Sequence, residues 1–403
     1  MAGDLETEIL VVGGGPAGLI LTARLTAMGR SVICVERAPP PADPEDPAAD
    51  LRTTAFLRPS VETLRRAGVW EALAPLAAPL RIMRIVQRAP DAGKPPRVSA
   101  DFTPPEEEEA GGPFGYNIPN AALRLALTRV LAERPGARLL APMTLEHWIA
   151  RFDGVRARLS DGRILRARLL IAADGRDSEI RRAAGIGVRR VDYGQKAIVA
   201  ALSHEAPHGY ASSEIHSSGG PLTFTPLRDP LRSGLVWMTP NLKSARLMAV
   251  SPEAFEAELQ AEAEAADLGL GRIRLLTRRA AWPIIGQLAE RLQAPRLALI
   301  AEAAHVVPPI GAQGMNMSLR DVEVLAEELA GASDPGAASV LGAYERRRLP
   351  DLRLRGFGVD LLNRAAKSDS RAIRDLRAFG LAAIRDVTPL RRTAVRLGLG
   401  EGG

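Results

Sequence analysis

The sequence predicts an α/β fold in which a domain built on a parallel sheet is interrupted by a mostly antiparallel β-sheet and followed by C-terminal helices. Three segments show the pattern of a strand end, a turn and a helix start: residues 9–28, 169–181 and 301–329. Before the third of them, β-rich runs separated by turn residues are typical of antiparallel strands, at residues 197–202, 222–227 and 235–239. Because the three turns must converge on one ligand, the α/β domain has to be discontinuous, with the second sheet inserted.

The first turn contains a glycine-rich sequence between an apolar run and a helical pattern. Gly13, Gly15, Ala17 and Gly18 follow the run at residues 9–12. A glycine at the first position permits a tight turn, one at the second lets a pyrophosphate approach the backbone, and one at the last allows close packing of helix on strand. The spacing therefore predicts a Rossmann-like dinucleotide-binding turn, rather than a chance cluster of glycines.

An acid at the end of the next strand supports this interpretation. The β-rich run at residues 32–35 ends in Glu36 and Arg37. An acid about 20 residues beyond the glycine turn is positioned to bind a ribose hydroxyl. Glu36 therefore favours the adenosine ribose of FAD or NAD and disfavours a 2′-phosphate.

The second turn ends in another acid. An apolar run precedes Asp174 and Gly175, and Ser178 is a suitable cap for a helix that begins with basic residues. Asp-Gly pairs are common in ordinary turns. Taken alone, this segment is better explained as an ordinary strand–helix junction.

The third turn has a stiffened loop before its helix. Pro308 and Pro309 restrict the backbone, while Gly311 and Gly314 permit conformations that other residues avoid. The partial positive charge at the start of the following helix would stabilise an electron-rich planar ligand, such as a reduced flavin ring. The alternative is an ordinary loop stiffened by prolines. We expect His305, in the preceding strand end, to be a packing and hydrogen-bonding residue rather than a base.

Together, in this order, the three segments resemble the single-component flavoprotein aromatic hydroxylases of the p-hydroxybenzoate hydroxylase fold group. Within that group the chain is most similar to the ubiquinone-biosynthesis hydroxylases. Further segments carry this resemblance, which covers nearly the whole chain: residues 50–55, 64–70, 116–124, 220–227 and 236–237.

The resemblance implies a Rossmann-like FAD-binding domain and a set of site residues. The cofactor-binding residues that it implies are Gly13, Gly15, Ala17, Gly18, Glu36, Arg37, Arg52, Arg124, Asp174, Glu302, Gly314, Met315 and Asn316. The loop of Pro309, Gly311 and Gly314 would lie against the flavin ring, and no side chain is predicted to act as a catalytic acid or base. One position departs from the family pattern, because Ala301-Glu302 stands where the family usually has Gly-Asp.

The resemblance also implies the reaction. We expect a monooxygenase that binds FAD, uses NAD(P)H as a transient co-substrate and uses O2 to hydroxylate the ring of a polyprenylated phenol in ubiquinone biosynthesis. Alternatives are a hydroxylase of small soluble phenols and a non-catalytic flavin-binding scaffold subunit. Expected partners are the lipophilic phenol and either a ubiquinone-biosynthesis complex or a membrane surface. Pocket candidates are Leu222, Phe224 and Pro226, which alternate along one strand, and Pro309; the alternative for the first three is plain core.

The expected division of the chain follows from these assignments. The FAD-binding domain comprises residues 1–80, 115–185 and 285–345, the substrate β-sheet domain residues 81–114 and 186–284, and the C-terminal helical region residues 346–403. At residues 373–387 an arginine-rich segment has an apolar stripe. That stripe predicts either a helix on anionic lipid or one docked on the flavin domain.

The composition is consistent with a large enzyme and disfavours a membrane-spanning, a disulfide-linked or a nucleic-acid-binding protein. With 403 residues and 46% apolar content, the chain can bury one or two cores. No apolar run approaches the roughly 20 residues of a membrane span, and no signal peptide is recognised, so we expect a cytoplasmic protein, peripheral at most to the inner membrane. The single cysteine, Cys34, excludes an internal disulfide. The net charge is +6, but the basic residues are dispersed and aromatics are only 4%, which disfavours nucleic acid. No metal site is predicted.

Overall fold

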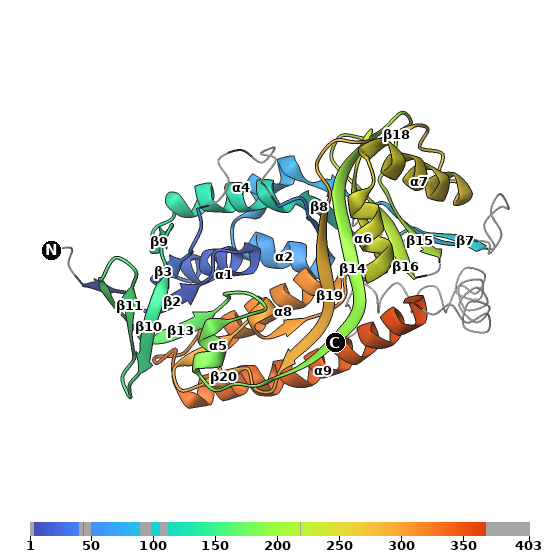
Figure 1. The fold of residues 1–403 in the computed structure, drawn as a ribbon. Coiled ribbons are helices and arrows are strands. Elements are labelled where there is room, and N and C mark those ends of the chain that lie inside the picture. The colour runs from blue at the N-terminus through green and yellow to red at the C-terminus, as the bar shows by residue number, and fades with distance from the viewer. Residues whose placement is uncertain are drawn as a thin grey trace.

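The computed structural model describes residues 4–39, 43, 50–88, 98–104, 112–217 and 219–367. The helix predicted at residues 373–387 lies outside these residues. The described chain is mixed α/β, and Figure 1 shows one set of helices around α1 and α8 and a second set, α6 and α7, on the other side of the long strands β14 and β19.

A six-stranded sheet forms the centre of the α/β part. Its strand order is β20 (Gln293–Ala294), β21 (Leu297–Leu299), β13 (Leu169–Ala172), β2 (Ile9–Val12), β3 (Val32–Val35) and β9 (Ala137–Leu140). All neighbours are parallel except β20 and β21. Because β2, β13 and β21 are adjacent, the segments that follow them begin at one edge of the sheet. The strands predicted at residues 9–12 and 32–35 are confirmed.

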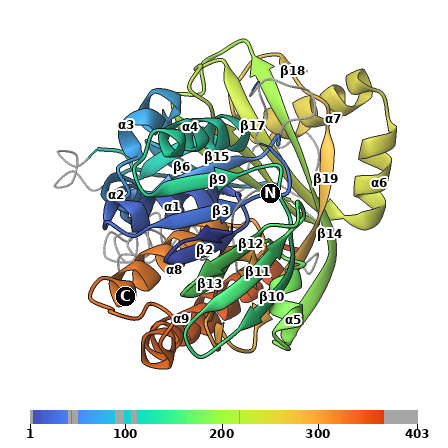
Figure 2. The same ribbon diagram turned by 90° about the vertical axis from the view of Figure 1, so that its left-hand side faces the viewer.

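Helices cover this sheet and bury its apolar residues. They are α1 (Pro16–Ala27), α2 (Arg58–Arg66), α3 (Trp70–Leu73), η1 (Ala74–Leu76), α4 (Asn120–Ala132), α5 (Glu179–Ala183) and α8 (Gln313–Leu329). Pro16 occupies the first turn of α1, where a missing N–H costs nothing, and Gly29 follows it at φ +81°. Figure 2, viewed from the side of this sheet, shows α1 lying over β2 and β3. Cys34 is buried, and burial raises the pKa of its thiol to about 12, as suits a structural residue.

A nine-stranded sheet forms the second layer. Its order is β22 (His305–Val306), β19 (Ala280–Ala289), β14 (Val188–His204), β17 (Arg232–Pro240), β16 (Gly220–Pro226), β15 (Ala211–Ser217), β6 (Ile82–Gln87) and β7 (Val98–Phe102), with β18 (Ile273–Leu275) paired to β14. Only β6 and β15 are parallel neighbours. The predicted antiparallel sheet is confirmed, but the strand predicted at residues 197–202 is part of a much longer one.

The helices α6 (Asn241–Ala249) and α7 (Pro252–Ala265) cover one face of this sheet. Ser251 caps α7 by accepting a hydrogen bond from the Ala254 N–H at 3.2 Å, as its position before Pro252 predicts. Ile198, Trp237 and Phe255 belong to the core between the sheet and these helices. The opposite face, which we call the inner face, carries Ala197, Val199, Thr223, Val236 and Met238, because side chains alternate along each strand.

Smaller elements connect the two layers. One sheet contains β1 (Leu5–Glu6), β12 (Ile164–Ala167), β11 (Val155–Leu159) and β10 (Leu145–Ala150), and another contains β4 (Thr53–Leu57), β8 (Gly115–Pro119) and β5 (Ala78–Pro79). The 3₁₀ turn η3 (Ala301–Ala303) follows β21. The long helix α9 (Ala338–Lys367) contacts α8 and also β16 and β19, so it runs along both layers (Figure 1). The exact domain boundaries stay a prediction.

Candidate active site

The glycines of the turn after β2 are of two kinds: at some a Cβ would clash with the backbone, and at another it would face open space. Gly13 has φ +114°, and a Cβ built on it would lie 2.2 Å from the Ala173 carbonyl oxygen. A Cβ on Gly18 would lie 2.0 Å from the Gly13 carbonyl oxygen. A Cβ on Gly15 meets nothing within 4 Å. The fold therefore requires Gly13 and Gly18, whereas the space in front of Gly15 is open to a ligand.

The helix that follows this turn presents its N–H groups without a side-chain cap. Gly15 is the N-cap residue of α1 and has extended geometry, and Ala17 is buried in the first turn. The first N–H groups of a helix have no partner within it and carry partial positive charge. This helix start can therefore bind a pyrophosphate directly through the backbone.

Two predicted residues hold the turn in place. Glu36 accepts hydrogen bonds from the Gly14 N–H at 2.5 Å and from the Ala38 N–H at 3.0 Å. Arg124, on α4, donates from Nε to the Gly14 carbonyl oxygen at 3.3 Å. Arg37 is exposed next to Glu36. The peptide groups on both sides of Gly14 are therefore fixed by side chains from other elements.

Asp174 has one satisfied and one unsatisfied carboxylate oxygen. Its Oδ2 accepts from the N–H groups of Glu179 at 3.0 Å and Ile180 at 3.3 Å, at the start of α5. Its Oδ1 is buried and has no hydrogen-bond partner among the described residues. Burial raises the pKa of Asp174 above its ordinary value. A buried carboxylate oxygen without a partner is costly, and a ligand hydroxyl would satisfy it. Ser178 caps α5 by accepting from the Arg181 N–H, as predicted.

The unusual Ala301-Glu302 pair has a backbone geometry that suits glycine. Ala301 has φ +53° and donates its N–H to Asp321 Oδ2 at 2.9 Å. Glu302 is half-exposed, and its Oε2 lies 3.5 Å from Arg176 Nε. A left-handed residue that carries a methyl group therefore forms this corner, and the half-exposed Glu302 carboxylate is accessible from outside the protein.

We predict that Ala301→Gly stabilises the protein. A residue with a Cβ in the left-handed region is strained, and glycine removes the strain, so the free energy of unfolding should rise by about 0.5–1 kcal/mol. Urea unfolding of the two proteins measures this difference. Ala304→Gly is the matched control, because Ala304 has an ordinary right-handed φ of −93° and is buried. The control should lose stability, and a loss in both variants would contradict the strain argument.

A buried ionic network anchors the corner that Ala301 forms. Asp321 Oδ2 also accepts from His305 Nε2 at 2.7 Å, and Asp321 Oδ1 accepts from Arg348 Nε at 2.8 Å. Burial alone would raise the pKa of Asp321, but the charges of His305 and Arg348 hold it below its ordinary value. His305 is buried and hydrogen-bonded, which confirms its expected packing role. The network ties η3, β22, α8 and α9 together beneath the third turn.

The loop before α8 presents its backbone outward. Pro309 and Gly311 are exposed, whereas Ile310 is buried against Ala197 and Met238 of the inner face. Gly311 and Ala312 have φ +60° and +56°, and α8 starts at Gln313 without a side-chain cap. The structure therefore contains the predicted uncapped helix N-terminus, whose N–H groups and partial positive charge can stabilise an anion. Gly314 lies in the first turn of this helix.

Asn316 uses its side chain to clamp α8 to β4. Its Oδ1 accepts from the Leu57 N–H at 2.9 Å, and its Nδ2 donates to the Ala55 carbonyl oxygen at 2.8 Å. Met315, beside it, packs partly against the main core. Both residues thus have structural roles, and ligand binding predicted for them would have to use their backbone N–H groups.

Arg52 connects the α/β layer with the nine-stranded sheet. Its Nε and Nη2 bind the two oxygens of Asp50 at 2.9 and 2.8 Å, and its guanidinium lies 5.2 Å from the ring centroid of Trp282 on β19. Next to it, Thr53 Oγ1 lies 3.3 Å from Thr225 Oγ1. The start of β4 therefore touches the inner face.

The interpretation of Leu222 and Phe224 as pocket residues is wrong. Both are buried in the core beneath α6 and α7, so they lie on the face away from the loop of Ile310. The alternation of side chains along the strand correctly predicts that Leu222, Phe224 and Pro226 share one face of the sheet. It does not indicate which of the two faces meets the ligand. Thr223 and Thr225 occupy the inner face instead. Pro226 is also buried, and its carbonyl oxygen accepts from Asn117 Nδ2 at 2.9 Å.

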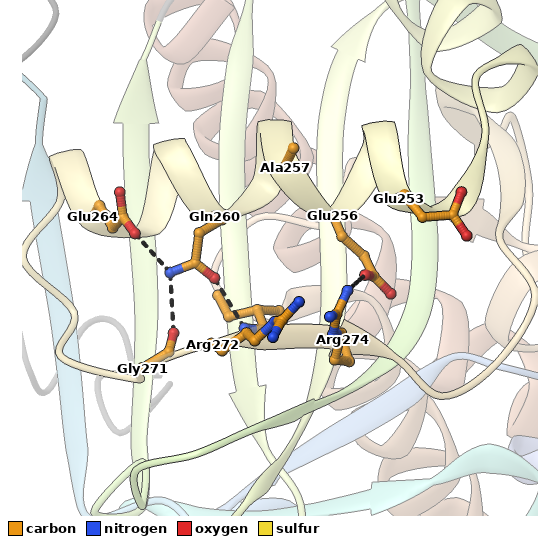
Figure 3. A pocket seen from close by; sticks show the side chains of 9 residues that line it. Glu253, Glu256, Ala257, Gln260, Glu264, Gly271, Arg272 and Arg274 are labelled. Carbon is orange, nitrogen blue, oxygen red and sulfur yellow. Dashed lines mark hydrogen bonds and ion pairs between the residues drawn. The ribbon is translucent and has the colours of Figure 1, made fainter.

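The surface pocket drawn in Figure 3 is separate from this site. It lies between α7 and the segment leading into β18, where Glu256 Oε2 pairs with Arg274 Nη1 at 2.6 Å and Gln260 bridges Glu264 and the Gly271 carbonyl oxygen. None of the predicted cofactor residues lines it. Within the described residues, no group of three or more His, Cys, Asp or Glu side chains could hold a metal ion.

Sequence reasoning missed several residues that shape the site. Arg176, Asp321, Arg348 and Trp282 are important contacts that no motif singled out. A signal for Asp321 was available, since it stands on the apolar stripe of α8 four residues from both Met317 and Leu325. A charged residue at such a position is rarely buried unless it is paired.

These features fit FAD. The open space at Gly15, the uncapped start of α1 and the unsatisfied Asp174 oxygen lie along one edge of the sheet and match a pyrophosphate followed by a hydroxylated chain. The uncapped start of α8 lies beside the inner face and matches an electron-rich ring. Fold and site together define a flavoprotein of the aromatic-hydroxylase class.

Comparisons with known proteins agree. The family described as "FAD binding domain" matches residues 6–353. Ubiquinone hydroxylase UbiL of Rhodospirillum rubrum is 37% identical over 98% of this chain and 90% of that protein, and 3-demethoxyubiquinol 3-hydroxylase of Escherichia coli is 30% identical over 98% of each. The chain belongs to this FAD-binding family, which includes the ubiquinone hydroxylases.

Solved structures share the fold. p-Nitrophenol 4-monooxygenase PnpA from Pseudomonas putida superposes with a TM-score of 0.78 at 18% identity, over 98% of each chain. PqsL, described as a probable FAD-dependent monooxygenase from Pseudomonas aeruginosa, gives 0.74 at 23% identity, over 93% of this chain and 99% of that one. The predicted Rossmann-like domain with an inserted sheet is confirmed as the fold class.

Proposed function

We propose that this protein is an FAD-dependent monooxygenase that uses NAD(P)H and O2 to hydroxylate the ring of a polyprenylated phenol in ubiquinone biosynthesis. The observation that carries the proposal is the convergence of three ligand-binding turns opposite an apolar sheet face. The names of the relatives from Rhodospirillum rubrum and Escherichia coli support the substrate class.

Each part of the site has a distinct task in this proposal. Bound FAD supplies the redox chemistry, taking electrons from NAD(P)H and using O2 to oxygenate the ring. The Gly15 backbone and the start of α1 bind the pyrophosphate, and Asp174 and Glu302 accept hydrogen bonds from hydroxyl groups. The start of α8 stabilises negative charge on the ring system. The apolar inner face around Val236 and Met238 excludes water and positions the phenol.

An assay with purified protein tests this function. A phenol with a short prenyl tail should stimulate NAD(P)H oxidation, and the product should contain one oxygen atom from isotopically labelled O2. Bound FAD that NAD(P)H cannot reduce, with or without the phenol, would favour a non-catalytic scaffold subunit. Hydroxylation of untailed phenols with equal or better kcat/KM would favour the hydroxylase of small soluble phenols.

We also propose that α9 docks on an anionic membrane surface. Three apolar side chains one helical turn apart are open to solvent: Leu354 is 72% exposed, Phe357 68% and Leu361 57%. Arg353 and Arg364 are exposed on the same part of the helix. An apolar stripe flanked by arginines suits the interface of an anionic bilayer. The apolar polyprenyl tail of the proposed substrate would partition into the same bilayer. Among the helices that the structure describes, none combines the length and the apolar character that spanning a bilayer requires.

Vesicle binding tests the membrane surface. We predict that the protein binds phosphatidylglycerol vesicles and that Phe357→Ser with Leu361→Ser weakens binding at least about tenfold, because each buried side chain contributes about 1.5–3 kcal/mol when fully transferred. Leu242→Ser is the control, since Leu242 is 88% exposed but lies on α6. Equal sedimentation of all variants, or association only with partner proteins, would contradict a membrane role for α9.

A further inference from the structure

A hydrogen-bonded glutamate–histidine pair lies on the inner face of the nine-stranded sheet, and the reaction as described so far does not use it. Glu214 Oε1 and His216 Nε2 on β15 are 2.7 Å apart, and their side chains are 20% and 17% exposed. The intervening Ile215 is buried in the core beneath α6 and α7. Because neighbours on a strand alternate in direction, Glu214 and His216 both point away from those helices.

Strand register places this pair beside the apolar wall of the site. Glu214 is paired across the strands with Thr223, and Thr223 is paired with Val236. Val236 packs with the cluster that contains Met238 and Ile310 of the loop before α8. Two strand spacings separate Glu214 from Val236, or about 10 Å. An aromatic ring bound between the Ile310 loop and β15 would therefore have this pair at its far edge.

The surroundings make the pair unusual. Its flanking positions on the inner face are Ile85 and Gln87 of β6 and Pro221 and Thr223 of β16, none of which is charged. At the α9 end of the face, Tyr193 donates to Asp360 at 2.6 Å and Lys367 donates to the Tyr193 carbonyl oxygen at 2.6 Å. On the α/β side, Arg52 is held by Asp50 and Glu302 lies near Arg176. These charged groups already have partners, whereas among the described residues the side chains of Glu214 and His216 bond only to each other.

We propose that His216 is the base that accepts the phenolic proton of the substrate and that Glu214 is the residue that positions it. With Nε2–H donating to Glu214, Nδ1 carries the free lone pair. The phenol O–H bond breaks, the proton moves to Nδ1, and the electron pair stays on the phenolate oxygen, which makes the ring a better nucleophile towards oxygen transfer. Glu214 stabilises the imidazolium that forms. This assignment rests on the proposed hydroxylase function.

The test combines turnover with the ionisation of a bound phenol. In the FAD-loaded protein, His216→Asn should lower the hydroxylation rate of 2-prenylphenol at neutral pH by about 100-fold or more, and the rate should recover as the pH approaches the pKa of the free phenol. Glu214→Gln should give a smaller loss. His147→Asn, at an exposed position on β10, is the control and should leave the hydroxylation rate unchanged.

A binding titration separates this proposal from the proposed function. The phenolate band of 2-prenylphenol bound to the wild-type protein should appear at lower pH than in solution, and His216→Asn should abolish that shift. This readout does not require turnover, so it remains decisive if the protein proves not to hydroxylate phenols. An unshifted or unbound phenol in the wild type, or an identical titration and pH profile in His216→Asn, would overturn the role of His216.

Discussion

Replacing Asp321 with asparagine should cost the protein about 3–5 kcal/mol of its free energy of unfolding, because it leaves the buried Arg348 with only Asp351, whose side chain is 30% exposed, as a counter-charge. Asp321 and Arg348 are fully buried, and the carboxylate accepts hydrogen bonds from Ala301, His305 and Arg348. An asparagine has only one acceptor oxygen for these three donors. Chemical unfolding monitored by tryptophan fluorescence measures the loss.

A partly exposed ion pair provides the matched control. Asp334 pairs with Arg296 at 2.5 Å, but its side chain is about one-third exposed. Because Asp334 stays partly in contact with water, whereas Asp321 is fully buried, Asp334→Asn should change stability less than Asp321→Asn. Comparable losses in the two variants would contradict the argument that burial makes the Asp321 network important.

The same network gives a pH dependence with a definite sign. The pKa of Asp321 is lower in the folded protein than its ordinary value of about 3.9. A carboxylate with a depressed pKa contributes stability that is present above the unfolded pKa and is lost as the pH falls through the folded one. Wild-type protein should therefore lose stability below about pH 4, and Asp321→Asn should lose less over that range.

Features that depend on residues close together in the chain could be predicted from the sequence, whereas features that depend on distant residues could not. The strand at residues 9–12, the glycine turn and the cap at Ser178 were predictable because each depends on neighbours in the chain. The side of the sheet on which Leu222 and Phe224 lie was not, since a strand with two buried faces gives no indication of which face meets the ligand. The partners of Asp321 were also hidden, because His305 and Arg348 come from separate elements.

Gly15 and Gly18 illustrate the same distinction within one motif. The sequence predicts both as binding residues, yet their surroundings differ: a Cβ on Gly18 would meet backbone at 2.0 Å, and a Cβ on Gly15 would meet nothing. Gly18 is therefore required for helix α1 to pack on β2, before any ligand binds. Gly15 is required only for binding a ligand in the open space next to its backbone. The two glycines can be separated by experiment.

Gly15→Ala should leave the fold intact and weaken FAD binding by about 10–100-fold, since a methyl group inserted into a close contact costs about 1–3 kcal/mol. Gly18→Ala should instead lower the melting temperature of the FAD-free protein. Gly331→Ala, also in open space but beyond the end of α8, is the control for a harmless methyl group. FAD affinity measured by fluorescence quenching, together with the melting temperature, distinguishes the variants. Unchanged FAD affinity in Gly15→Ala would mean that the pyrophosphate does not approach this turn. A pyrophosphate bound close to the backbone of residue 15 would clash with the added methyl group, and the affinity would then fall.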